Sequence, residues 1–226
     1  METSTVILLL VLIVLFAVVW ICDRKYSLLR DVSTASIKPY SFSRVQLAWW
    51  TCIVLAAFIT IIFTKHQIPT LDSSTLVLLG IGVGTTAVAT MIDVSDQSNP
   101  ALKLSQNDKG VNFFLDILSD KNGVSISRLQ VVIFNIVFGL WFVITVCHNL
   151  RMVDPYVYTD LAKCVDCATD HSSVYNLIIP KICDNNLILL GLSSGTYVAL
   201  KATENKQRLP ANNNVDPHQA EVKDNG

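Results

Sequence analysis

Charged residues are scarce in this chain of 226 residues, and the places where they are missing are informative. They make up 15% of the sequence, against about 25% in soluble globular proteins, while hydrophobic residues make up 51%. Five apolar runs contain no Asp, Glu, Lys or Arg at all. We therefore predict an all-α integral membrane protein with five transmembrane helices, over Thr5–Cys22, Val45–Thr64, Thr75–Ile92, Leu129–Cys147 and Leu187–Leu200.

The lack of charge inside these runs also argues against several functions. Ion-coupled transporters, proton pumps and voltage sensors carry ionisable side chains within the membrane, and the runs offer only Ser, Thr, Asn and Gln as polar groups. Ser-His-Asp, HExxH, Walker and Rossmann patterns are absent as well. We expect neither an enzyme nor a cofactor, and the sequence offers no site for a nucleic acid duplex.

No basic residue precedes the first run, so it is predicted to be a retained anchor rather than a cleaved signal peptide. Arg24 and Lys25 follow that run directly, which places the N-terminus outside and the C-terminus in the cytoplasm. On this topology 13 of the 17 Lys and Arg residues lie inside. The fifth run is short, so it spans if Lys201 snorkels to the interface, and is otherwise a re-entrant segment.

These expectations divide the chain into six parts and one insert. They are an anchor (1–22), a basic cytoplasmic linker (23–44), a first two-helix unit (45–93), a cytoplasmic loop (94–127), a second two-helix unit (128–201) with an extracytoplasmic insert (149–186), and a disordered tail (202–226). Within the loop, apolar residues at helical spacing predict an amphipathic helix from about Val111 to Ser119.

Two short motifs occur twice in the same order, which indicates a duplicated two-helix unit. Ser41–Gln46 (SFSRVQ) matches Ser125–Gln130 (SISRLQ), and each copy opens an apolar run. One run later, LLGIGVGT, which ends at Thr85, matches LLGLSSGT, which ends at Thr196. The two units should therefore run in parallel, both from inside to outside and back.

The first motif fits a capping box, in which Ser43 pairs with Gln46, and Ser127 with Gln130. Its arginines, Arg44 and Arg128, would then lie at the inner headgroup level and bind lipid phosphates. A sharper interpretation makes the two arginines a ring at the inner mouth of a pore. The candidate pore or ligand residues are Arg44, Arg128, Gln46, Gln130 and Asn135.

The second motif has the Gly-x-x-x-Gly spacing that lets two membrane helices approach closely. The predicted packing residues are Gly80, Gly84, Thr85, Gly191, Gly195 and Thr196. The alternative is that these small residues line a narrow conduction path. Because one subunit carries two such faces, we expect a homo-oligomer embedded in the lipid bilayer.

The insert gathers cysteines on the side predicted to be oxidising, where disulfides are the usual state. We expect Cys183 to pair with Cys147, Cys164 or Cys167. Two alternatives stay open, a zinc site from Cys164, Cys167, His171 and Cys183 and a redox-active Cys164-x-x-Cys167.

The duplicated layout resembles a family of uncharacterised bacterial multi-span inner-membrane proteins. Their repeats begin with Ser-x-x-Arg-x-Gln and end with a Leu-Leu-Gly-Ile-Ser-x-Gly-Thr stretch. The resemblance covers about residues 38–201 without the insert, and rests on Ser41, Arg44, Gln46, Gly80, Gly84, Thr85, Ser125, Arg128, Gln130, Gly191, Ser193, Gly195 and Thr196. It implies a bacterial inner membrane and carries no activity with it.

Two functions are compatible with these features. The first is a homo-oligomeric channel or pore-forming effector gated from the cytoplasm by a small molecule or protein, as in bacterial stress or anti-phage defence. The alternative is a non-conducting assembly or sensor subunit that binds a partner through its insert.

Overall fold

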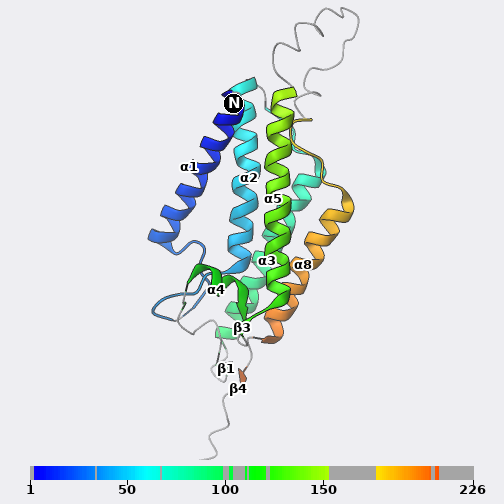
Figure 1. Ribbon diagram of the computed structural model, residues 1–226. Coiled ribbons are helices and arrows are strands. Elements are labelled where there is room, and N and C mark those ends of the chain that lie inside the picture. Colours follow the sequence, from blue (N-terminus) through cyan, green and yellow to red (C-terminus); the bar gives the residue numbers. More distant parts are fainter. Residues whose placement is uncertain are drawn as a thin grey trace, which may run out of the picture.

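The computed structural model describes residues 3–33, 35–66, 68–98, 102–103, 110, 112–120, 123–152, 177–204 and 207–208. These residues form an elongated bundle of helices (Figure 1). The long helices are α1 (Thr3–Tyr26), α2 (Phe42–Lys65), α3 (Ser73–Gln97), α5 (Ile126–Met152) and α8 (Asp184–Glu204). The predicted helical fold is thus confirmed in its main feature.

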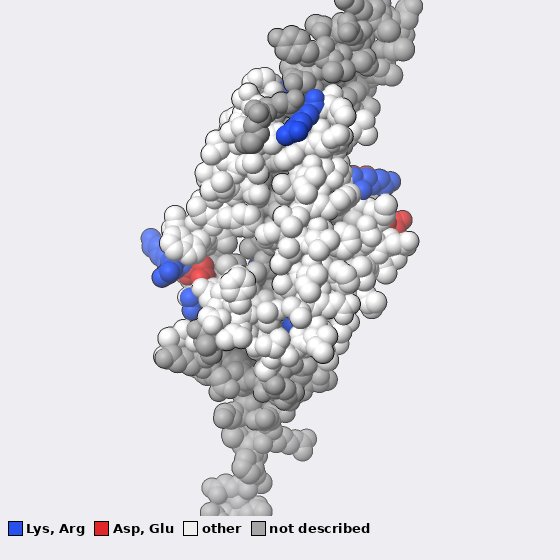
Figure 2. Space-filling model, in the orientation of Figure 1, with Lys and Arg blue, Asp and Glu red and all other residues white. Residues whose placement is uncertain are grey.

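Four of the helices, α1, α2, α3 and α5, are long and apolar enough to cross a membrane. They correspond to the first four predicted runs, and each extends a few residues beyond its run. The face drawn in Figure 2 carries few charged side chains over the described residues, as expected for helices that face lipid.

The two ends of the bundle are named here by the segments that lie there. At the linker end, residues 27–41 connect α1 to α2; at the insert end, α2 is joined to α3 and α5 ends (Figure 1). The linker folds back on itself, with the amide of Asp31 donating to the carbonyl of Pro39 at 2.9 Å and that of Ser41 donating to Leu29 at 2.8 Å.

Residues 177–183 are not helical, and they run along the bundle in an extended conformation before α8 begins (Figure 1). Ile178, Ile179 and Ile182 of this segment are almost completely buried. Two side chains meet its backbone: Asn149 donates to the carbonyls of Leu177 and Ile178, and the Ser74 hydroxyl accepts from the amide of Ile182 at 3.0 Å. Buried irregular backbone is tolerated among membrane helices only with such partners.

The start of α3 belongs to the same arrangement. Asp72 caps the helix, and its carboxylate accepts from the Ser74 amide at 2.9 Å. Hydrogen bonds from the Ser74 side chain and backbone lower the pKa of Asp72 below its ordinary value. The Ser74 hydroxyl therefore joins the cap of α3 to the extended segment.

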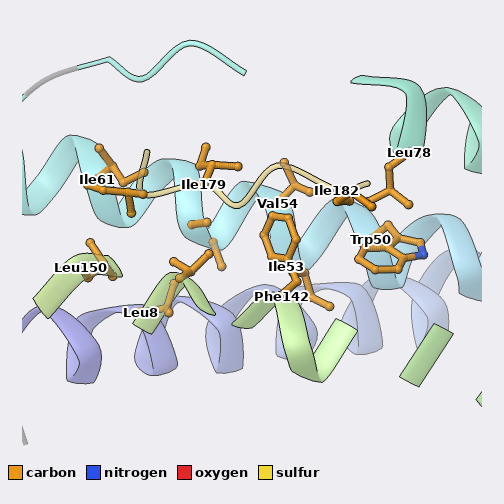
Figure 3. Close-up of a cluster of buried hydrophobic side chains, with 14 of the residues drawn as sticks. Leu8, Trp50, Ile53, Val54, Ile61, Leu78, Phe142, Leu150, Ile179 and Ile182 are labelled. Carbon is orange, nitrogen blue, oxygen red and sulfur yellow. The ribbon is translucent and has the colours of Figure 1, made fainter. Parts of the chain in front are cut away.

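The main core fills the half of the bundle toward the insert end (Figure 3). Trp50, Ile61 and Phe142 are its largest side chains from α2 and α5, and the indole of Trp50 meets the Phe142 ring edge-on at 6.4 Å between centroids. Ile179 and Ile182 of the extended segment pack into the same cluster. A second, smaller cluster near the linker end joins Phe42, Ala89, Ile117, Val131 and Tyr197.

The loop predicted to hold an amphipathic helix does so over a shorter stretch than expected. α4 spans only Phe113–Leu118, and Ser119–Asp120 (β2) then pairs antiparallel with Gly123–Val124 (β3). The polar tail also differs from expectation, because α8 continues to Glu204 and Gln207–Arg208 (β4) pairs with Leu102–Lys103 (β1). Residues 209–226 lie outside the described residues.

The Trp49 side chain of α2 packs directly against α5 at Gly139, which the sequence motifs do not mark. A Cβ placed on Gly139 would lie 2.5 Å from Nε1 of Trp49, whose indole donates to the backbone carbonyl of Asn135 at 3.1 Å. Only a glycine leaves room for that ring.

We therefore expect Gly139→Ala to lower the free energy of unfolding by about 1–3 kcal/mol, as overpacking of a filled site does. Gly191→Ala is the matched control, because a Cβ there would meet Ile81 at an ordinary 3.5 Å. Thermal unfolding of both variants in detergent measures the difference, and equal melting temperatures would argue against a tight Trp49 contact.

Candidate functional site

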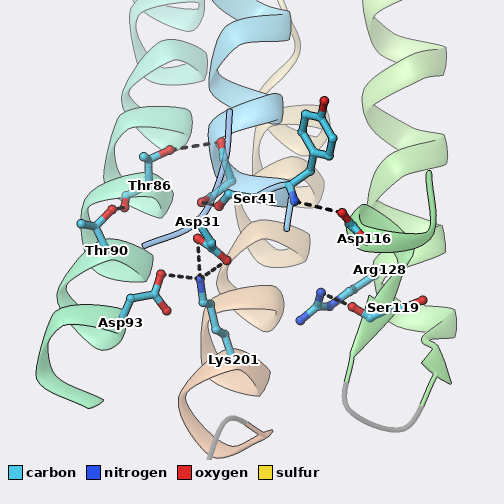
Figure 4. Close-up of polar contacts among 11 residues, drawn as sticks. Asp31, Ser41, Thr86, Thr90, Asp93, Asp116, Ser119, Arg128 and Lys201 are labelled. Carbon is cyan, nitrogen blue, oxygen red and sulfur yellow. Dashed lines mark hydrogen bonds and ion pairs between the residues drawn. The ribbon is translucent and has the colours of Figure 1, made fainter. Parts of the chain in front are cut away.

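The most distinctive site is a buried ion cluster at the linker end, defined by Asp31, Asp93 and Lys201 (Figure 4). The Lys201 ammonium, from α8, lies 2.8 Å from Oδ2 of Asp93 on α3 and 3.2 Å from Oδ2 of Asp31 in the linker. The Lys201 and Asp93 side chains are only 3% and 2% exposed, and that of Asp31 is 13% exposed. The cluster ties the linker to both α3 and α8.

The charges of this ion cluster do not balance. Two carboxylates share one ammonium, and Oδ1 of Asp93 is buried without a hydrogen-bond partner. Buried charges are costly unless they are paired, so each member depends on the other two. An arrangement of this kind holds three segments together while it is intact and favours their separation once one member is lost.

The sequence patterns do not reveal this cluster, because the apolar runs end one residue too early. Asp93 directly follows the run Thr75–Ile92, and Lys201 directly follows Leu187–Leu200. Lys201, whose snorkelling was one condition for the fifth run to span, is 2% exposed and ion-paired. One feature of the sequence could have indicated the pair: Asp93 and Lys201 have opposite charges and stand directly after apolar runs that occupy equivalent places in the two repeats.

The part of the linker next to the cluster is held by a second set of charges. Arg30 lies 3.7 Å from the buried carboxylate of Asp23, and it donates to the carbonyl of Lys38 at 3.0 Å and to the Tyr40 hydroxyl at 3.1 Å. The other Asp23 oxygen accepts from the amide of Leu29 at 2.9 Å. These contacts shape the linker on either side of Asp31.

A row of polar groups continues from the ion cluster toward the middle of the bundle, between α2, α3 and α8. Thr86 donates to the carbonyl of Ser43 at 3.1 Å, and Thr90 donates to the carbonyl of Thr86 (Figure 4). Further along, the Gln46 amide donates to the hydroxyl of Ser194 at 2.9 Å. Polar contacts therefore cross this interface in its linker half, beside the smaller apolar cluster of Phe42, Ala89 and Tyr197, while the half toward the insert end is apolar.

The predicted capping boxes are wrong for the first motif and not seen for the second. α2 begins at Phe42, so Ser43 lies inside the helix, and the Ser41 side chain makes no cap bond. Gln46 reaches across to α8 instead of back to its own helix start. In both copies the two serines pair with each other, Ser41 with Ser43 at 3.2 Å and Ser125 with Ser127 at 2.8 Å.

The candidate pore residues have different surroundings in the described chain. Arg128 donates to the carbonyl of Ser119 and stacks over the Tyr197 ring, 5.4 Å from its centroid. Arg44 is half-buried and Gln130 is exposed. Asn135 belongs to the packed interior, where its Oδ1 accepts from the Trp50 indole at 2.7 Å and its Nδ2 donates to the Val131 carbonyl.

The repeated glycines divide into two groups. Gly191 meets Ile81, so α8 and α3 do pack through the second motif, whereas Gly80, Gly84 and Gly195 have open space where a side chain would lie. The hydroxyls of Thr85 and Thr196 donate back to their own helices, to the carbonyls of Ile81 and Leu192. The sequence predicts hydroxyl bonds from one helix to another here. Within the described part of the subunit, these two threonines do not make them.

The disulfide prediction is not supported by the cysteines that the structure describes. Cys147 and Cys183 both have free thiols. Cys164, Cys167 and His171 lie outside the described residues, and so do the zinc and redox alternatives that depend on them.

Among the described residues, no group of three or more His, Cys, Asp or Glu side chains is placed to hold a metal ion. In the ion cluster, the cation between the two carboxylates is the Lys201 ammonium. Comparison with protein-family models, with curated proteins and with solved structures finds no match to this chain, so its function has to be argued from the ion cluster and the bundle around it.

Proposed function

We propose that this protein is a homo-oligomeric membrane channel or pore-forming effector that is gated from its linker end. The observation that carries the proposal is the ion cluster, because it connects the linker, through Asp31, to α3 and α8, the two helices that carry the Gly-x-x-x-Gly motifs. A regulator that displaces the linker would leave Asp93 and Lys201 to rearrange. The excess of Lys and Arg at that end favours the cytoplasmic side of a bacterial inner membrane.

A five-helix topology follows if α8 also crosses the membrane. Its 21 residues correspond to about 31 Å of helix, close to the thickness of the hydrocarbon layer. α2–α3 and α5–α8 then form the two parallel units. Their equivalence is supported by the serine pairs at the start of α2 and α5, and by the matching threonine bonds of Thr85 and Thr196.

The conducting path of this proposal lies between subunits rather than within one. In the half toward the insert end, the bundle is filled by large apolar side chains such as Ile61, Phe142 and Leu150, which are no more than 1% exposed. The face of α3 and α8 that carries Gly80, Gly84 and Gly195 is open in the single subunit. Small residues on such a face allow the close backbone contact that drives helix association in lipid.

We expect Gly84→Leu and Gly195→Leu to break the assembly, because each would separate two backbones at a subunit contact. A Cβ at either position has no neighbour within 4 Å in the subunit, so the fold should be kept. Native mass spectrometry in detergent reads the oligomeric state, and Ala17→Leu, on an exposed face of α1, is the control. A monomeric wild type, or oligomers unchanged by both leucines, would refute this assembly.

Conductance of the purified protein in planar bilayers, with and without cell extract, tests the function itself. We expect Asp31→Asn to raise the open probability in the absence of extract, because it weakens the hold of Lys201 on the linker. If neither the wild type nor the variant conducts, with or without extract, the protein is not a channel.

The closed apolar core favours one alternative, a non-conducting assembly or sensor subunit in which the ion cluster transmits a linker movement across the bundle. The same bilayer recording separates the two. A sensor would stay silent while the linker changes its protease susceptibility in Asp31→Asn.

A further inference from the structure

A groove of about 350 Å³ opens between α1 and α5 near the linker end, and it belongs to none of the sites above. α2 forms its floor through Val45, Ala48 and Trp49, and α4 closes one end with Phe114. Figure 2 shows the hollow near the middle of the face drawn. Its lining is apolar except for two side chains, Gln46 and Asn135.

The position of the groove indicates which kind of molecule it meets. Three of its walls, α1, α2 and α5, are helices apolar enough to cross a membrane, so the opening faces the hydrocarbon layer. Its rim is apolar too, with Phe114 73% exposed and Ile136 45% exposed. A volume at the lower end of the range of about 300–1,000 Å³ for ligand pockets suits a single flexible chain rather than a bulky cofactor.

Positive charge lies next to the groove at the linker end. Arg24 and Lys25 are exposed in the last turn of α1, and Arg30 adjoins Leu29, which lines the groove. Figure 2 shows Lys and Arg side chains on the side of the hollow where α1 ends, with acidic side chains beside them. Asp23 pairs with Arg30, which leaves a surplus of two positive charges among these four residues. Clusters of basic residues next to membrane helices attract anionic headgroups.

Gln46 adds a hydrogen-bond acceptor at the same level. It is 4% exposed, its Nε2 is already bound to Ser194, and its Oε1 has no partner. Gln46 lies about one turn from the start of α2, near the expected depth of a lipid headgroup. The glycerol headgroup of phosphatidylglycerol carries hydroxyls that can donate to such an oxygen.

We propose that this groove binds one acyl chain of an anionic phospholipid of the phosphatidylglycerol type, with its phosphate held by Arg24 and Lys25. The inference does not depend on conduction. It assigns the space between α1 and α5 to a structural or regulatory lipid.

Native mass spectrometry of the delipidated full chain, titrated with phosphatidylglycerol or phosphatidylcholine, tests this site. We expect one tightly bound phosphatidylglycerol per subunit and at least tenfold weaker binding of phosphatidylcholine. Ala48→Trp should lower phosphatidylglycerol occupancy at least tenfold, because it fills the floor of the groove. Ala17→Trp is the matched control, since Ala17 is exposed on α1 and does not line the groove.

A second experiment tests the role of the lipid's charge. Arg24→Gln combined with Lys25→Gln should bring the affinities for the two lipids close together. Crosslinking by phosphatidylglycerol with a diazirine on its acyl chain should map to α1, α4 and α5 of the wild type, a result that does not require Ala48→Trp to fold. Equal binding of both lipids, or crosslinks found as often on α3 and α8 as on these helices, would overturn the proposal.

Discussion

Replacing Lys201 by methionine should lower the free energy of unfolding by about 3–5 kcal/mol, because Asp31 and Asp93 would lose the cation that they share. Asp93 is the more sensitive of the two, since its side chain is only 2% exposed and one of its oxygens already lacks a partner. Thermal unfolding in detergent, followed by circular dichroism, measures the loss. Lys181→Met is the matched control, because Lys181 is exposed outside the helices and should shift stability by less than about 0.5 kcal/mol.

A double variant separates the charge from the packing of Lys201. Lys201→Met combined with Asp93→Leu removes both members of the shortest ion pair, so much of the lost stability should return. Asp31, at 13% exposure, is then the only charge of the cluster left, and it lies close to water. If Lys201→Met were as stable as Lys181→Met, the ion cluster could not be the element that holds the linker to α3 and α8.

The sequence predicts the apolar half of this protein well, because long apolar runs have few alternatives to a membrane helix. Four of the five runs are helices of suitable length and hydropathy. The ends of the helices are predicted poorly. α3 and α8 continue past their apolar runs, and the charges just beyond the runs, Asp93 and Lys201, meet inside the bundle. Pairing across helices is a tertiary property, and no spacing within one helix reveals it.

The same limit applies to the glycines and to Gln46. Gly-x-x-x-Gly spacing predicts a face suited to close contact, but it does not specify the partner; Gly80, Gly84 and Gly195 find none within the subunit. Gly139, which has no repeat and no motif, has the closest neighbour of all the described glycines. Gln46 fits a local cap by its spacing, yet it bonds to Ser194, 148 residues away. A spacing within one helix predicts contacts within that helix. Contacts between helices, such as the bond from Gln46 to Ser194, take the place of some of them.

Trp50 and Asn135 form the polar contact around which α2 and α5 pack. The Trp50 indole is 1% exposed, lies edge-on to Phe142, and donates at 2.7 Å to Oδ1 of Asn135, which is itself 6% exposed. Nδ2 of Asn135 donates to the carbonyl of Val131, so the side chain cannot turn to find a new partner without losing that hydrogen bond. Removal of the indole therefore creates a cavity and an unsatisfied buried oxygen at once.

We expect Trp50→Ala to lower the free energy of unfolding by about 3–5 kcal/mol, the usual range for truncation of a large buried aromatic side chain. Trp50→Phe keeps most of the ring and loses the N–H, so it should cost about 1–3 kcal/mol, which is the cost of leaving Asn135 Oδ1 without a donor. Trp20→Ala is the control for tryptophan itself, because Trp20 is 60% exposed on α1. Thermal unfolding in detergent should rank the three variants in that order, with Trp50→Ala the least stable. If Trp20→Ala were as damaging as Trp50→Ala, the α2–α5 contact would not be the centre of the core.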